Sequence, residues 1–257
     1  MKINDFIEKS SQPQDIDTLY KSLESVLAHE CGYDRVIFSL MSDHASLKLP
    51  AGHGIMRNYP DDWMRHYIAK GYEHIDPVRR FGFRSVGPFV WDSLPLVMNI
   101  TEEQKTCMNE SKEAGFYNGA AVCLRGAMGE IGGIGVAMSS QKKLDSPLEA
   151  KRKLSMLNII SHQFYSAFCH VHNQNVQSAN QEVVLTKREV QVVGQMALGK
   201  KDMAIAHELN ITNHAVHFHT RNILKKFQAS NRIAAVIKAV NSGIVAPEQS
   251  LWIRQSV

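Results

Sequence analysis

The sequence has no run of about 18 consecutive apolar residues, so it predicts no transmembrane helix. Its first fifteen residues also lack the apolar core and cleavage site of a secretion signal, which favours a cytoplasmic protein that binds no membrane. Hydrophobic residues make up 44% of the 257 residues and charged residues 21%, as in globular proteins. This length is sufficient for two domains.

Cysteine is scarce, and no CxxC motif occurs. We interpret the four widely spaced cysteines as reduced, mostly buried thiols: Cys31, Cys107, Cys123 and Cys169. The twelve histidines do not form a metal motif either, because the closest group, at positions 214, 217 and 219, does not share one helical face. We therefore expect neither a disulfide framework nor a metal site.

The motifs of common enzymes are absent as well. The sequence contains no GxSxG element, no P-loop and no dinucleotide fingerprint. The Gly-rich segment over residues 126–135 covers a turn and part of a strand, whereas a phosphate loop joins a strand to a helix. A response regulator is disfavoured, because the segment RVIFSLMSDH around the first predicted strand holds no acidic pair. We expect no catalytic residues and no cofactor.

What the sequence does contain is a helix-turn-helix pattern over residues 185–226. Thr186 and Glu189 form a capping box that begins a helix. A second short helix follows, and Asn210 suits the left-handed backbone of the turn after it. Thr212 is then the predicted N-cap of an amphipathic third helix. This succession is typical of a DNA-binding helix-turn-helix.

The outer face of the third helix suits DNA, with short polar side chains near its start for base edges and cations farther along for phosphates. Residues 176–257 hold ten basic and five acidic residues, a net charge of +5, whereas residues 1–175 carry −1. The alternative is a small helical bundle with a solvated charged face, which the agreement of caps, turn and charge disfavours. The candidate DNA-binding residues are Lys200, Thr212, Asn213, His214, His217, Arg221, Lys225 and Lys226.

The amino-terminal part combines helices with strands. Periodicity predicts helices over residues 15–30 and 101–114 and from Ser146 to about His170. It predicts strands over residues 35–41, 119–124 and 130–140, with a polar loop over 42–53. We expect an α+β protein: an amino-terminal α/β/α sandwich with a central antiparallel sheet, then a four-helix helix-turn-helix domain.

The expected domain boundaries follow the composition. Residues 1–171 form the first domain, and the Asn- and Gln-rich segment 172–182 is the predicted linker. Residues 183–245 form the helix-turn-helix domain. The tail over 246–257 contains Trp252, which docks on a surface or, as is more usual for such tails, is frayed.

A second informative stretch, over residues 58–77, is rich in aromatic side chains. Tyr59, Trp63 and Tyr67 recur every four residues, which predicts rings along one helical face. Asp76 follows, and a carboxylate beside aromatic rings is costly unless hydrogen bonds reach it. Taken alone, the stretch is better explained by an aromatic core patch with an Asp-Pro turn or helix cap.

The two stretches together resemble quorum-sensing receptors of the LuxR type, which join an acyl-homoserine-lactone-binding domain to a LuxR/FixJ-type helix-turn-helix. Three positions depart from the DNA-binding pattern: Ala204 replaces the usual Glu, Ala215 the usual Thr and His217 the usual Lys. These departures bear on which bases are read. The amino-terminal matches are Tyr59-Pro60, Trp63, Tyr67, Asp76-Pro77, Trp91 and Gly115, and the carboxy-terminal ones include Thr186, Glu189, Gly199-Lys200, Ile211-Thr212, Val216, His219 and Asn231-Arg232.

The resemblance implies a role for each pocket residue. The Trp63 indole donates to the lactone carbonyl, Asp76 accepts from the ligand amide, and the Tyr59 hydroxyl donates to the amide carbonyl. The ligand then supplies the partner that a buried Asp76 otherwise lacks. Tyr67 and Trp91 wall the pocket. Two further residues, Ser39 and Gly135, are expected along the acyl chain.

The implied function is a bacterial transcription activator that binds an N-acyl-homoserine lactone and, as a homodimer, double-stranded promoter DNA. RNA polymerase is a further implied partner. Three alternatives are an orphan receptor for a different small molecule, a response regulator with the same DNA-binding domain, and an enzyme that processes acyl-lactones. No pattern of a nucleophile with a general base in the sequence supports the enzyme alternative.

Overall fold

The computed structural model describes residues 1–13, 15–44, 47, 49–126, 129–141, 146–176 and 183–245. The chain forms two compact units that divide between Ser178 and Ala179. Most of the predicted linker, and the tail with Trp252, lie outside the described residues. No helix among the described residues is long and apolar enough to span a bilayer.

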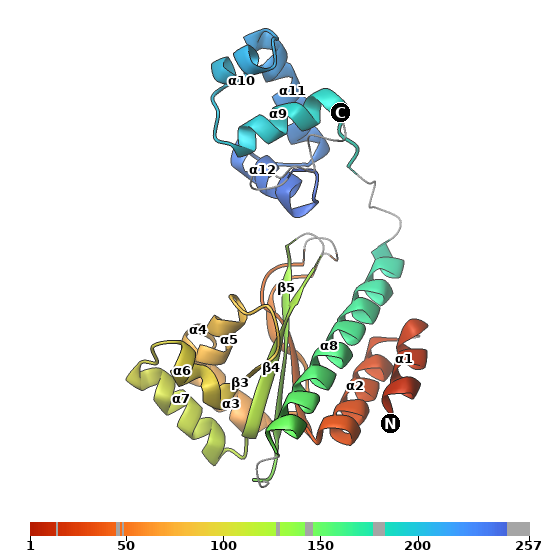
Figure 1. The fold of residues 1–257 in the computed structure, drawn as a ribbon, viewed down its shortest axis with the longest axis vertical. Helices are drawn as coiled ribbons and strands as arrows, with labels where there is room; N and C mark the ends of the chain where they lie inside the picture. Colours follow the sequence, from red (N-terminus) through yellow and green to blue (C-terminus); the bar gives the residue numbers. More distant parts are fainter. Residues whose placement is uncertain are drawn as a thin grey trace. The chain divides into compact units, whose positions relative to one another are not determined.

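The first unit is an α+β sandwich (Figure 1). Its strands are β1 (Arg35–Leu40), β2 (Gly52–Arg57), β3 (Phe89–Val90), β4 (Tyr117–Arg125) and β5 (Ile131–Met138). Its helices are α1 (Ile3–Ser11), α2 (Ile16–Cys31), α3 (Asp61–Ala69), α4 (Tyr72–Ile75), α5 (Pro77–Gly82), η2 (Trp91–Ser93), α6 (Leu94–Val97), α7 (Glu102–Glu113) and α8 (Pro147–Val176).

The strands pair antiparallel throughout in the order β2-β1-β5-β4-β3. Helices α1, α2 and α8 cover one face of this sheet and α3 to α7 the other (Figure 1). The predicted fold class, an α/β/α sandwich around an antiparallel sheet, is therefore confirmed.

Strand alternation decides which side chains reach each face of the sheet. On β1, Val36 and Phe38 enter the core beneath α2 and α8, where the Phe38 ring lies 5.1 Å from that of Phe164. Ile37 and Ser39 point to the opposite face. On β5 the alternation places bulky Ile134 in the core. It leaves Gly133 and Gly135 on the opposite face of β5, toward α3 to α7.

Three predictions of secondary structure need correction. Helix α1 was not expected, although its Phe6 is fully buried in the core. Strand β2 begins inside the predicted polar loop: its sequence GHGIMR has little strand propensity, and pairing with β1 stabilises it. Helix α8 continues to Val176 rather than ending near His170, so the first residues of the predicted linker are helical.

The second unit consists of α9 (Lys187–Ala197), α10 (Asp202–Glu208), α11 (Asn213–Lys226) and α12 (Arg232–Asn241). The capping box of Thr186 and Glu189 is present, and the Thr212 hydroxyl accepts from the Ala215 N–H at 3.1 Å. Asn210 has a φ of 51°, the left-handed turn that its sequence position predicted. These features confirm the helix-turn-helix.

Candidate functional site

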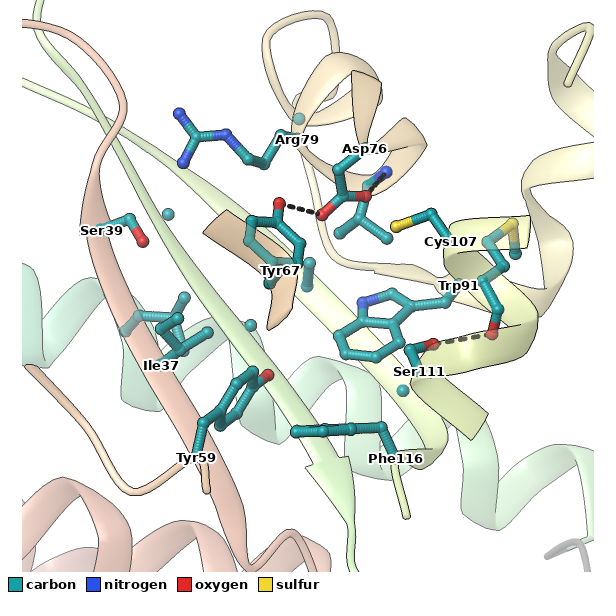
Figure 2. Close-up of a pocket in the computed structure, with 18 of the residues that line it drawn as sticks. Ile37, Ser39, Tyr59, Tyr67, Asp76, Arg79, Trp91, Cys107, Ser111 and Phe116 are labelled. Atoms are coloured by element: carbon teal, nitrogen blue, oxygen red, sulfur yellow. Dashed lines mark hydrogen bonds between the residues drawn. The ribbon is translucent and has the colours of Figure 1, made fainter. Parts of the chain in front are cut away.

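A cavity lies between the sheet and helices α3 to α7 (Figure 2). All seven candidate ligand residues line it: Ser39, Tyr59, Trp63, Tyr67, Asp76, Trp91 and Gly135. They come from β1, β5, α3 and the segments around α5 and η2, so the fold brings together residues nearly a hundred positions apart. The cysteine prediction also agrees, since all four thiols are free and all but Cys169 are buried.

The aromatic rings of the cavity form one cluster. Trp63 and Tyr67 lie one turn apart on α3, with centroids 6.1 Å apart and planes tilted by 59°. Tyr59 precedes α3, so it is not on the same helical face as predicted. It joins the cluster through Phe116, whose ring centroid lies 4.5 Å away. The sequence analysis missed Phe116, which follows the predicted helix 101–114 without any motif.

Trp91 sits against the sheet where glycine leaves room for it. A Cβ on Gly119 would lie 2.0 Å from Cε3 of the Trp91 ring, which no side chain tolerates. A Cβ on Gly135 would lie 3.5 Å from the Tyr59 hydroxyl and 3.8 Å from Cζ2 of Trp91. Gly119 therefore seats the indole, and Gly135 forms the open wall beneath both rings.

Asp76 already has protein partners on both carboxylate oxygens, contrary to the prediction that only a ligand would supply one. Tyr67 donates its hydroxyl proton to Oδ2 at 2.8 Å, and the Val78 N–H donates to Oδ1 at 2.7 Å as the cap of α5 (Figure 2). Burial raises the pKa of Asp76, while these hydrogen bonds and the Arg79 charge oppose the rise. Each oxygen retains capacity for a further donor.

Two other polar atoms of the lining are buried without a partner among the described residues: the Tyr59 hydroxyl and the Trp91 indole nitrogen. Burial raises the pKa of Tyr59 well above its usual value, so the hydroxyl keeps its proton. An unpaired buried donor costs about 1–3 kcal/mol. The cavity thus presents two donors and one carboxylate to whatever occupies it.

A polar corner completes the lining, formed by Ser39, His53 and Arg79. The Ser39 hydroxyl accepts from the Gly54 N–H at 2.9 Å and lies 3.2 Å from Nδ1 of His53. A guanidinium nitrogen of Arg79 lies 2.6 Å from the same Nδ1. The His53 ring stacks on Tyr67 at 4.9 Å. The sequence analysis missed His53 and Arg79, because no motif marks either residue.

The candidate DNA face lies on α11 and its surroundings. Asn213, His214, Arg221 and Lys225 are exposed. Three other candidates have partners within the unit: Lys200 pairs with Glu208, His217 with Asp202, and Lys226 with Glu189. Thr212 is exposed but caps α11. Phe218, 56% exposed on the same helix, was missed because exposed aromatic residues carry no pattern.

No group of three His, Cys, Asp or Glu side chains that could hold a metal ion occurs in the described part of the chain. The features present are a cavity with convergent polar groups and a helix-turn-helix with an exposed polar face.

Comparison with known proteins gives the same two parts. Residues 17–166 match the autoinducer binding domain and residues 183–239 the bacterial regulatory proteins of the luxR family. The chain is 28% identical to the transcriptional activator protein VanR of Vibrio anguillarum, over 91% of this chain and 92% of VanR. It is also 28% identical to the transcriptional activator AnoR of Acinetobacter nosocomialis, over 89% of this chain and 92% of AnoR.

The fold is similar to that of Escherichia coli SdiA, with a TM-score of 0.65 and 21% identity over 94% of this chain and 96% of SdiA. Members of the matched families are transcriptional regulators, not enzymes. The protein described here therefore belongs to the LuxR family of bacterial transcriptional activators with an amino-terminal autoinducer-binding domain.

Proposed function

We propose that the protein binds an N-acyl-homoserine lactone in the cavity and, as a dimer, controls promoter DNA in the bacterial cytoplasm. The observation that carries the proposal is the buried, unpaired hydroxyl of Tyr59 beside the Asp76 carboxylate in one cavity, whose lining also includes the Trp63 indole. An acyl-homoserine lactone offers an amide N–H and two carbonyl oxygens, which require one acceptor and two donors.

The proposed contacts assign one protein group to each polar atom of the ligand. Asp76 accepts from the amide N–H while keeping its bonds to Tyr67 and Val78. Tyr59 donates to the amide carbonyl, and the Trp63 indole donates to the lactone carbonyl. Trp91 and Tyr67 wall the head group, with Ser39 and Gly135 beside the acyl chain.

For DNA, we propose that Asn213 and His214 face base edges at the start of α11 and that Arg221 and Lys225 face phosphates. Three further candidates each pair with an acidic residue of the same unit, so we propose that they also hold the DNA-binding unit together: Lys200, His217 and Lys226. RNA polymerase is the further partner that an activator requires. We retain the domain boundaries 1–171, 183–245 and 246–257, with the linker at 172–182, as part of this proposal.

The test is a DNA-binding titration of the full chain with and without each lactone of a panel. Thermal unfolding of the protein without DNA is measured with and without the same lactones. A ligand that binds only the folded state raises the melting temperature. DNA affinity should change with the stabilising lactone and fall steeply with salt. A panel in which no lactone raises the melting temperature would refute the receptor proposal.

A second ligand class follows from a structural relative, since SdiA has been solved in complex with octanoyl-rac-glycerol at 22% identity and a TM-score of 0.64 to this chain. An acylglycerol has an ester in place of the amide and therefore no N–H for Asp76. If an acylglycerol stabilises the protein and an acyl-homoserine lactone of the same chain length does not, the protein is an orphan receptor of this second kind.

A further inference from the structure

The polar corner of the cavity contains a cation, Arg79, that is in direct contact with no carboxylate of the described residues. Among the described residues Arg79 forms no ion pair with a carboxylate, and its side chain makes its hydrogen bond to His53. The nearest acid along the chain, Asp76, accepts hydrogen bonds from Tyr67 and Val78, and the Arg79 charge acts on its pKa only without direct contact. Figure 2 shows the Arg79 side chain extending away from Asp76, on the side of Ser39.

His53 does not balance this charge. Burial, with the charges of Arg79 and Arg57, lowers the pKa of His53 to about 4, so the ring is neutral near pH 7. Its Nδ1 accepts from Arg79 and lies within reach of the Ser39 hydroxyl, which itself accepts from Gly54. The three groups hold one another in place, and most of the five guanidinium N–H donors remain for another acceptor.

The rest of this side of the cavity is apolar, with Met41, Val78, Gly82 and Phe89 in the lining. Arg79 is partly buried, so a ligand that covers its guanidinium without offering an acceptor would remove the charge from water at a cost. An alkyl chain placed here would cover the cation with hydrocarbon and add to that cost. The guanidinium fork instead matches the two oxygens of a carboxylate, and binds a single carbonyl oxygen less strongly.

We propose that Arg79 selects the acyl group of the ligand: the preferred lactone carries an acceptor oxygen on its acyl chain, with a carboxylate bound most tightly, in place of a plain alkyl chain. Ser39 and His53 are positioning residues that hold the guanidinium toward the cavity. This inference rests on the proposed function, because it concerns the acyl end of the same ligand.

The experiment compares three homoserine lactones of equal chain length by calorimetric titration of the full-length protein. Their acyl groups are octanoyl, 3-oxo-octanoyl and an octanoyl analogue that ends in a carboxylate. A charge-assisted hydrogen bond predicts an affinity at least about tenfold higher for the best oxygen-bearing lactone than for the octanoyl compound. Equal affinities, or tighter binding of the octanoyl lactone, would overturn the inference.

Arg79→Gln tests the assignment, and the matched control is Arg80→Gln, which removes the same charge from an exposed neighbour. The first variant should lose the preference for oxygen-bearing chains, and the second should keep it. Arg79→Lys, which retains the cation without the fork, should keep part of it and serves if Arg79→Gln does not fold. A preference unchanged in Arg79→Gln and Arg79→Lys contradicts the role of Arg79.

The two proposals fail in different ways. If the three lactones bind equally, only the selection by Arg79 is wrong. If no lactone of any kind binds, the proposed function is wrong and this inference falls with it.

Discussion

The two units of the chain satisfy their buried polar groups in opposite ways. In the cavity the Tyr59 hydroxyl and the Trp91 indole are buried with no partner in the described part of the chain. In the helix-turn-helix the carboxylate of Glu189, only 3% exposed, is bonded to the Thr186 N–H at 2.7 Å and to the Lys226 ammonium at 2.6 Å. The cavity of the first unit thus leaves two donors unpaired, whereas the buried carboxylate of the second unit is paired within that unit.

This difference indicates how each unit meets its partner. A cavity with buried unpaired groups is stabilised most by a small molecule that supplies hydrogen-bond partners to them, and such buried contacts respond weakly to salt. A unit whose buried carboxylate is already paired is expected to bind a polyanion through its exposed cations, and that binding depends strongly on salt. The predictions below test this contrast, beginning with the largest effect.

Replacing Lys226 by Met should destabilise the helix-turn-helix by about 3 kcal/mol, because it leaves the buried Glu189 carboxylate without its cation. Hydrogen exchange of the α9 and α11 amides measures this loss without interference from the first unit. Lys225→Met is the matched control: Lys225 is exposed, so its loss should leave exchange unchanged and reduce DNA affinity and its salt dependence. Equal exchange in both variants would contradict the structural role of Lys226.

The same pair predicts a pH dependence. Burial raises the pKa of Glu189, but hydrogen bonds from Lys226 and Thr186 outweigh burial and leave the folded-state pKa lowered. A group of this kind stabilises the fold above its unfolded pKa and loses that contribution as pH falls through the folded one. The exchange protection of α9 should therefore fall toward acid pH in the wild type and less so in Lys226→Met.

Asp76→Asn should weaken lactone binding by about 2 kcal/mol, the usual worth of a hydrogen bond to a charged group. Trp63→Phe should act in the same direction, because it removes the proposed donor to the lactone. Both variants should leave DNA binding without ligand unchanged, since neither residue belongs to the second unit. Calorimetric titration is the measurement, and an unaltered lactone affinity in a folded variant would remove these residues from the site.

The elements that sequence analysis predicted well are those that local chemistry specifies. The caps Thr186 and Thr212 each begin their helix as their sequence positions indicate. The predicted strand over residues 35–41 is present as β1, and its alternation places Phe38 in the core and Ser39 in the cavity. In each case the deciding contacts lie within four residues, or follow from the twofold period of a strand.

The parts that were missed depend on distant contacts. Strand β2 exists because β1 pairs with it, and its Gly54 has a φ of 62° beside an irregular register. His53 reaches the cavity only through that strand. Arg79 resembles any surface arginine in the sequence, and only the turn at Asp76 directs it inward. The two partners of Asp76 were likewise invisible without the positions of α3 and α5.

Gly135→Phe should shift the preferred acyl chain to shorter lengths, at about 0.8 kcal/mol for each methylene that no longer fits. The first atom of the new side chain would already lie 3.0 Å from Cγ2 of Ile37 and would fill the space below Tyr59 and Trp91. The measurement is a dose–response series over chain lengths, with the melting temperature of the free variant as the control for folding. An unchanged length profile in a folded variant would exclude this wall from the acyl path.

The smallest effect gives the sharpest test of the contrast between the units. Replacing Tyr59 or Tyr67 by phenylalanine is expected to change the stability of the unliganded protein in different directions. Tyr59→Phe removes a buried hydroxyl without a partner among the described residues, so the unliganded protein should be as stable as the wild type or more stable by about 1 kcal/mol. Lactone affinity should fall by about 1 kcal/mol.

Tyr67→Phe removes a hydroxyl that donates to Asp76, so stability and affinity should both fall. Thermal unfolding with and without lactone separates the two patterns. If Tyr59→Phe destabilised the free protein as Tyr67→Phe does, the Tyr59 hydroxyl would serve the fold rather than a ligand, and the cavity would no longer differ from the helix-turn-helix in this respect.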